Sequence, residues 1–250
     1  MNKSFKITSF SVGKERGPLE GTIQIDSHSE ICVLADGLGG KERGDLAAQL
    51  AGEFITRFVD SQSIETQSTW LFEKREDLSL EENFLRMALL YAHGKIVARA
   101  QQEEKMGWMG CSVLAALSHD DKLILSGVGN CRAYLFRKDS LTQLTQDNSL
   151  AKFKGLAPLS RLQNIPLNFL GKAPQIDIDT SVEKVTKPHD LYLLLSPGIT
   201  NALSPQTLLE IIQSHQTKTG DIAKTIALQS ATENPTQDHR VIVLQKLESH

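Results

Sequence analysis

Three apolar runs lie close together in the middle of the chain, separated only by short groups of turn-forming residues. They span residues 111–117, 123–128 and 133–136, and each has the length of a β-strand. The residues between them include His119-Asp120-Asp121 and Gly129-Asn130, whose Asp, Gly and Asn favour tight turns. Strands joined by such short turns pair antiparallel, because parallel strands need a long crossover connection. The segment 111–145 is therefore predicted to hold three or four consecutive antiparallel strands.

Other segments show the periodicities of strands and helices. Alternation and apolar content predict strands at 5–12, 22–26, 31–35, 176–180, 191–196 and 240–246. Apolar residues at helical spacing predict helices at 46–58, 80–104, 205–214 and 219–230. Clustered strands beside clustered helices favour an α+β fold over strict βαβ alternation. No repeat or linker divides the sequence, so residues 1–250 are predicted to form a single domain.

Composition narrows the class of protein. The chain has 250 residues, 40% of them hydrophobic, which is enough for a substantial core. Its net charge of −3, without a basic run, argues against nucleic acid as a partner. No stretch approaches the roughly 20 apolar residues of a membrane span, and the N-terminus has no signal-peptide core. We expect a soluble cytoplasmic protein whose partners are proteins, with neither nucleic acid nor membrane among them.

The cysteines give a second indication of the compartment. Cys32, Cys111 and Cys131 are odd in number, lie in apolar stretches and have no CxxC spacing. We expect buried thiols in a reducing environment rather than disulfides or a zinc site.

A buried strand ends at a carboxylate and a glycine-rich turn. Asp36 follows the apolar residues 31–35, and Gly37, Gly39 and Gly40 precede a predicted helix. Asp-Gly after a strand is often only a turn device. The glycines lack the third position of a dinucleotide fingerprint and the hydroxyl residue of a P-loop, so both nucleotide-binding interpretations fail.

Four further blocks accompany this segment in order along the chain. They are Arg16-Gly-Pro-Leu-Glu20-Gly21, Gly127-Val-Gly-Asn130-Cys-Arg132-Ala-Tyr134, Leu194-Leu195-Ser196-Pro197-Gly198-Ile199-Thr200-Asn201, and Gln237-Asp238-His239-Arg240-Val241-Ile242-Val243. Together, over about residues 8–246, the five blocks resemble the metal-dependent Ser/Thr protein phosphatases of the 2C type, the PPM family. The resemblance implies an α/β/β/α sandwich of two antiparallel sheets flanked by helices.

The resemblance also implies a chemistry and a set of ligands. In that family, two manganese or magnesium ions are held by carboxylates, and a metal-bridging water attacks a phosphoserine or phosphothreonine. By resemblance, Asp36 would bridge both ions, with a carbonyl oxygen from Gly37. Glu20 would reach the second ion and Asp238 would bind the first. Arg16 would clamp the substrate phosphate as a bidentate fork.

The departures from the family pattern fall on the site itself. Gly21 stands where the family carries an acid, and Asn130 replaces an aspartate that is often tied to a third metal. Pro197 replaces a metal-binding aspartate, and Asn201 replaces a further one. His239 replaces the usual asparagine and could serve as a substitute ligand, although strand alternation would turn it away from its acidic neighbour.

Charge counting then separates the functional hypotheses. Two divalent ions bring four positive charges, whereas only Glu20, Asp36 and Asp238 are assigned to balance them. We therefore expect manganese or magnesium to bind as one weak ion or not at all. The leading hypothesis is a pseudophosphatase that binds or regulates a protein or phosphoprotein. The alternative is a weak or atypical Mn/Mg-dependent Ser/Thr phosphatase. In that case Glu20, Asp36 and Asp238, with a nearby acid such as Asp147 or Asp177, rebuild the site. A third is a scaffold without phosphate affinity.

Overall fold

The computed structural model describes residues 4–15, 20–38, 43–62, 64, 71–102, 109–146, 165–172, 176–178, 180–215 and 218–248. Four residues that the sequence singled out lie outside these ranges. They are Arg16, Gly39, Gly40 and Asp147.

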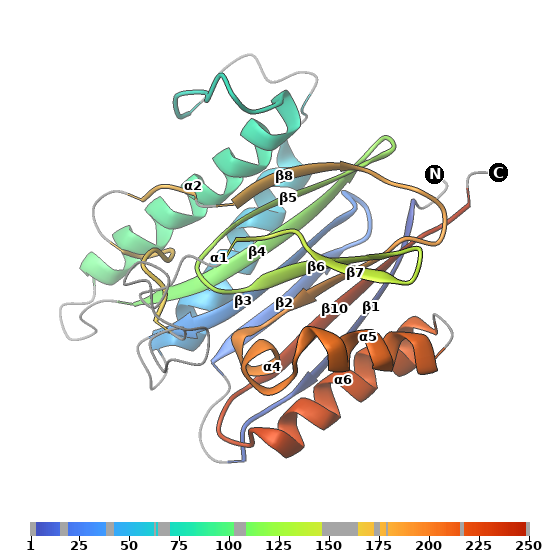
Figure 1. Cartoon of the computed structure of the whole chain (residues 1–250). Coiled ribbons are helices and arrows are strands. Elements are labelled where there is room, and N and C mark those ends of the chain that lie inside the picture. Colours follow the sequence, from blue (N-terminus) through green and yellow to red (C-terminus); the bar gives the residue numbers. More distant parts are fainter. Residues whose placement is uncertain are drawn as a thin grey trace.

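Two five-stranded antiparallel sheets form the centre of the molecule (Figure 1). Sheet A has the order β1 (Phe5–Val12), β10 (His239–Lys246), β9 (Leu191–Leu195), β6 (Arg132–Arg137) and β7 (Ser140–Gln143). Sheet B has the order β2 (Gly21–Asp26), β3 (Ile31–Leu38), β4 (Gly110–His119), β5 (Lys122–Val128) and β8 (Thr180–Val185).

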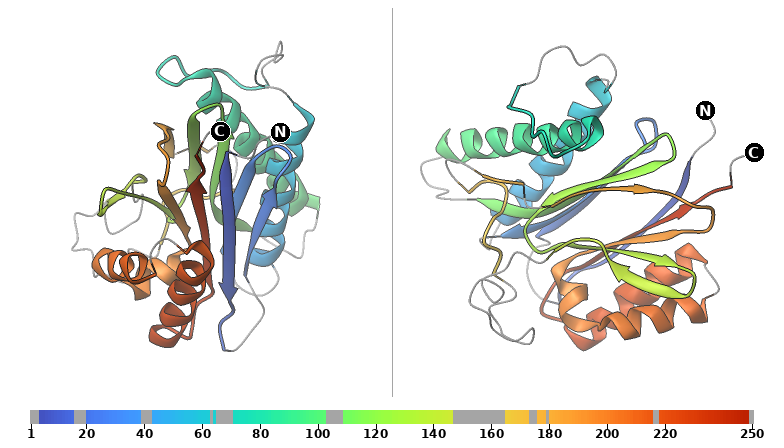
Figure 2. Two further views of the ribbon diagram at one scale, coloured as in Figure 1. Left: turned by 90° about the vertical axis from the view of Figure 1, so that its right-hand side faces the viewer. Right: turned by 45° about the horizontal axis from the view of Figure 1, so that its top comes forward.

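Helices cover the outer face of each sheet. Helices α1 (Arg43–Ser61) and α2 (Leu80–Gln102) pack on sheet B. Helices α4 (Pro197–Ala202), α5 (Pro205–Ser214) and α6 (Thr219–Glu233) pack on sheet A. The two helical layers lie on opposite sides of the strands (Figure 2). The predicted α/β/β/α sandwich is therefore confirmed. Within the described ranges, no helix combines the length and apolar character needed to cross a membrane.

Strand alternation sorts the side chains of β3 and β10 into three core layers. In β3, the odd-numbered residues from 31 to 35 pack beneath α1 and α2, whereas Cys32 and Leu34 face the other sheet. In β10, Val241 and Val243 face the helices. Its even-numbered residues 242 and 244 face sheet B. Side chains two residues apart on a strand share a face, so position 36 and position 240 both point into the end of the sandwich.

Most predicted elements agree with the structure to within a few residues, but two do not. The strand predicted at 176–180 is displaced: β8 begins at Thr180, and 176–178 lie outside any strand. The apolar pattern there has a different cause, because Ile176 and Ile178 pack into the core beneath the helices. The short helix α4 was not predicted; it begins at Pro197, whose ring suits a first helical turn.

The three cysteines are buried and free, as predicted. Burial raises the pKa of the Cys32 thiol to about 12. Burial likewise raises the pKa values of Cys111 and Cys131 well above the ordinary thiol value. All three groups therefore stay protonated near neutral pH, and the thiolate that would react is scarce.

We predict that the folded protein is inert to an aromatic disulfide reagent at neutral pH, because the reagent needs an accessible thiolate. The same protein in concentrated guanidinium chloride should release the chromophore of three thiols. The measurement is absorbance against time under both conditions. Rapid labelling of the folded protein would contradict the burial described here.

Candidate functional site

A cavity of about 200 Å³ lies at one end of the sandwich and gathers most of the residues singled out from the sequence. Six of them line it: Glu20, Asp36, Gly37, Asn130, Pro197 and Asp238. Asp36 and Gly37 lie on β3, and Glu20 and Asp238 directly precede β2 and β10. Asn130 lies between β5 and β6, and Pro197 is the first residue of α4. The sandwich therefore brings together positions that are more than 200 residues apart along the chain.

Asp36 points into this end of the sandwich from β3. Its strand neighbours are Gly21 on β2 and Ser112 on β4. Its Oδ1 atom lies 3.3 Å from Nη1 of Arg240. Burial raises the pKa of Asp36 to about 7, although the guanidinium of Arg240 acts in the opposite direction. Asp36 is thus a partly buried acid with a cationic partner beside it.

Asp238 is the most fully engaged carboxylate of the site. Oδ1 accepts the main-chain N–H of Lys14 at 2.9 Å, and Oδ2 accepts that of Glu20 at 2.7 Å. Oδ2 also accepts from Nη2 of Arg240 at 3.0 Å. Burial by itself would raise the pKa of Asp238, but these hydrogen bonds and Arg240 together hold it below the ordinary aspartate value. Asp238 therefore fastens the connection between β1 and β2 to the start of β10.

Arg240 is the residue of the site that the sequence reasoning missed. Its side chain is 3% exposed, and its guanidinium spans Asp36 on one sheet and Asp238 at the start of the other. A signal was present, because Arg240 is two residues after Asp238 and two before Ile242, and alternation gives all three the same face.

Glu20 and Gly37 form the outer part of the site. The carboxylate of Glu20 pairs with Nζ of Lys14 at 3.0 Å. The main-chain N–H of Gly37 donates to the carbonyl of Glu20. A side chain at position 37 would overlap the backbone of Gly44 on α1, so the close approach of strand and helix requires glycine here.

Gly21, Asn130 and Pro197 lie around the carboxylates without adding an acid. A Cβ atom at position 21 would come within 2.5 Å of both Nη1 of Arg240 and the carbonyl oxygen of Ala35. The side-chain oxygen of Asn130 accepts from Oγ of Ser112 at 2.8 Å. Pro197 lines the cavity at the start of α4 and offers no ligating side-chain atom.

The two remaining substituted positions are not among the residues that line the cavity. Asn201 donates to Gln237 at 3.1 Å. His239 is fully buried, and its Nε2 atom lies 2.8 Å from the carbonyl oxygen of Asn234, at the end of α6. Alternation along β10 thus directs His239 toward the helices, away from Asp238. Its suggested role as a replacement ligand has no geometric support.

Asp177, considered as an extra acid, acts elsewhere. It is not among the residues that line the cavity. Its charge acts instead on Arg75, before α2, whose pKa is raised mainly by the hydrogen bond to Asp77 and to a smaller extent by Asp177.

The described side chains do not fit the pair of ions that the family resemblance implies. Hard divalent cations need several free oxygen ligands. Here Asp36 and Asp238 already face a guanidinium, and Glu20 faces an ammonium group. Within the part of the chain that the structure describes, no three His, Cys, Asp or Glu residues are grouped so that they could hold a metal ion.

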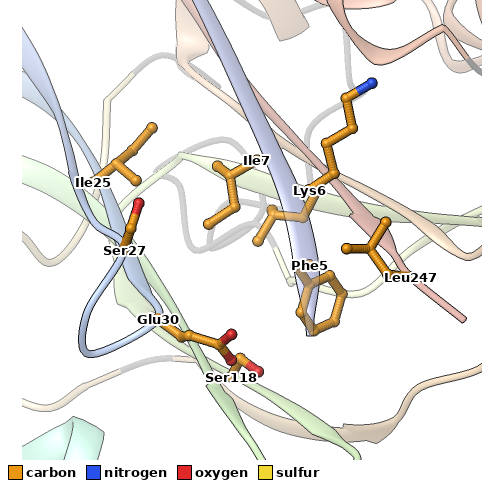
Figure 3. A pocket seen from close by; sticks show the side chains of 9 residues that line it. Phe5, Lys6, Ile7, Ile25, Ser27, Glu30, Ser118 and Leu247 are labelled. Carbon is orange, nitrogen blue, oxygen red and sulfur yellow. The ribbon is translucent and has the colours of Figure 1, made fainter. Parts of the chain in front are cut away.

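A second cavity of about 350 Å³ has a different character. It lies between β1 and the β2–β3 turn, and Phe5, Ile7, Ile25 and Leu247 give it a largely apolar lining (Figure 3). Its one acid, Glu30, accepts the main-chain N–H of Ser4 at 2.8 Å. Among its lining residues there is no group of carboxylates, so the cavity at the acidic end remains the candidate functional site.

We predict that Asp238→Ala lowers the free energy of unfolding by about 3 to 5 kcal/mol, because the buried guanidinium of Arg240 loses a partner. Two main-chain N–H groups lose their acceptor as well. Chemical denaturation monitored by circular dichroism measures the change. Asp60→Ala, on the exposed side of α1, is the control and should change the value by no more than about 0.5 kcal/mol. Equal effects of the two substitutions would refute the anchoring role.

Comparison with known proteins places the chain in a family. Residues 20–215 match the family model described as protein phosphatase 2C. The serine/threonine phosphatase stp of Listeria monocytogenes serovar 1/2a is 28% identical over 205 residues, covering 79% of this chain and 77% of the relative.

Solved structures show the same fold. The Mycobacterium tuberculosis serine/threonine phosphatase PstP has a TM-score of 0.82 at 21% identity, covering 98% of this chain and 99% of that one. The catalytic domain of PstP in complex with two manganese ions has a TM-score of 0.80 at 22% identity, with the same coverage. The family match over residues 20–215 and the shared sandwich establish that this chain belongs to the protein phosphatase 2C family.

Proposed function

We propose that this chain is a pseudophosphatase, a 2C-type domain that binds or regulates a protein or phosphoprotein partner without efficient hydrolysis. The observation that carries the proposal is the charge balance of the site. The carboxylates of Glu20, Asp36 and Asp238 face two cations, Lys14 and Arg240. A divalent ion that approaches this site therefore meets about one net negative charge. Three unpaired carboxylates would present three negative charges.

The composition of the cavity wall supports the same proposal. Metal-dependent hydrolysis needs ions that keep open positions for water and phosphate while protein oxygens hold them in place. Pro197 contributes a ring to the wall where the family pattern has a carboxylate, and Asn130 contributes an amide. At most one weakly held manganese or magnesium ion is expected here, and an efficient two-ion centre is not.

A second candidate function is a weak or atypical Mn/Mg-dependent Ser/Thr phosphatase. The relatives favour it, because those compared here are named serine/threonine phosphatases and one structure holds two manganese ions. On sequence similarity alone this alternative is the better supported of the two. The paired charges around Asp36 favour the pseudophosphatase. Turnover measurements separate the two candidate functions.

The proposed partners and compartment follow from the rest of the chain. A net charge of −3 and the absence of a basic run in the sequence favour a protein partner over nucleic acid. We also propose that the protein works in the cytoplasm, without a membrane partner, and the three free, buried cysteines are consistent with a reducing compartment. A phosphate clamp at Arg16 remains a prediction from the family resemblance. A scaffold without phosphate affinity requires that Arg16→Ala leave partner binding unchanged.

We predict that the purified protein, with manganese or magnesium, hydrolyses a phosphothreonine peptide or an aryl phosphate no faster than its Asp36→Ala variant. The physical reason is that the wild-type carboxylates are already paired with internal cations. Release of inorganic phosphate measures the rate. Manganese-dependent turnover that is lost in Asp36→Ala would establish the phosphatase alternative instead.

A further inference from the structure

We propose that Arg240 is a built-in cation that takes the place of the metal ions, and that Gly21 provides the space for it. This inference deepens the proposed function and rests on it, because it gives a physical reason why the site would not hold the family's two ions. The positive charge that holds the acidic end of the sandwich together then comes from a side chain of the protein rather than from bound metal ions.

The geometry of the guanidinium is that of a bridge between two acids. Nη1 lies 3.3 Å from Oδ1 of Asp36, and Nη2 lies 3.0 Å from Oδ2 of Asp238. The planar fork of Arg240 therefore presents one nitrogen to each carboxylate. By family resemblance, these two carboxylates are the ones that would share the first metal ion. In this structure the single positive charge of Arg240 pairs with both carboxylates.

Gly21 makes this placement possible. Gly21 is paired with Asp36 across β2 and β3. A larger residue at position 21 would therefore place its side chain beside the carboxylate of Asp36. Nη1 of Arg240 and the carbonyl oxygen of Ala35 each lie 2.5 Å from where a Cβ atom of residue 21 would be, so only glycine leaves room for the guanidinium here. The loss of the acid at position 21 and the presence of Arg240 are thus two parts of one arrangement.

The backbone around Arg240 holds the side chain in place. The N–H of Arg240 donates to Oγ of Ser196 at 3.0 Å, and its carbonyl accepts the N–H of Ser196 at 3.0 Å. The side chain is 3% exposed, so its charge is stabilised by the two carboxylates rather than by water. A metal ion would have to displace a buried, doubly paired guanidinium before it could bind.

The test is the effect of manganese on thermal stability in the wild type and in Arg240→Met, which keeps much of the side-chain volume without its charge. Without metal, the variant should melt roughly 6 to 12 °C lower, because two carboxylates lose their cation. Manganese should leave the wild type unchanged and raise the melting temperature of Arg240→Met. Calorimetry should show at least about 10-fold tighter manganese binding by the variant, because an opposing charge has been removed.

Arg137→Met provides a matched control. Arg137 on β6 pairs through Nε and Nη2 with the buried Asp190, at 2.7 and 2.5 Å, on sheet A outside the candidate site. Its loss should also lower the melting temperature, but manganese should not restore it. This control separates a specific gain of metal binding from a general response of a destabilised protein to added cations.

Three results would overturn the inference. They are wild-type protein that binds manganese as tightly as Arg240→Met, a folded Arg240→Met that gains no manganese binding, and equal rescue of Arg137→Met. If Arg240→Met does not fold, a measurement on the wild-type protein alone still tests the inference. The guanidinium resonance of Arg240, assigned by through-bond correlation, should stay sharp when paramagnetic manganese is added, and selective broadening would show an ion in its place.

These measurements read metal binding without a phosphorylated substrate, so they can fail independently of the proposed function. An inert wild type that binds manganese tightly would refute the role of Arg240 while leaving the pseudophosphatase proposal standing. Turnover by a wild type whose Arg240 resonance is unaffected by manganese would refute the pseudophosphatase alone.

Discussion

The contact of one guanidinium with two carboxylates closes the acidic end of the sandwich. Asp36 comes from β3 of sheet B, whereas Asp238 and Arg240 come from the start of β10 in sheet A. Asp238 in turn accepts the main-chain N–H groups of Lys14 and Glu20. The two sheets and the connection between β1 and β2 therefore meet at one charged cluster.

The hydrophobic layers explain why that cluster forms where it does. Alternate residues of β3 and β10 fill the space between the sheets, with Leu34 on one side and Ile242 on the other. The same alternation continues past the last apolar positions, so the next inward side chains are Asp36 and Arg240. Burial of a single charge there would be costly, but opposite charges arriving from both sheets compensate one another. Packing thus sets the geometry, and complementary charge makes it stable.

The sequence predicts the fold well because the spacing of apolar residues repeats over many positions. The site depends on only a few side chains, which form no such repeating pattern. The strand at 5–12 and the helix at 205–214 agree with the structure, since each carries several apolar positions in register. The strand expected at 176–180 was displaced because a short apolar run fits a core contact as well as a strand. Arg240 was missed although alternation from Asp238 already placed it on the inward face. No single-sequence pattern predicts which carboxylates a buried arginine will reach across two sheets.

Family membership and the chemistry of the site rest on different parts of this molecule. The match over residues 20–215 reflects the packing of sheets and helices, which tolerates the low identity to relatives such as the Listeria phosphatase. The chemistry depends on a handful of side chains, and among them Gly21 and the guanidinium of Arg240 lie side by side. A Cβ atom at position 21 would lie 2.5 Å from both Nη1 of Arg240 and the carbonyl oxygen of Ala35. In the proposed pseudophosphatase, the glycine at position 21 and the charge of Arg240 together leave a closely packed site with about one net negative charge. Such a site would keep the fold without favouring the binding of two divalent ions.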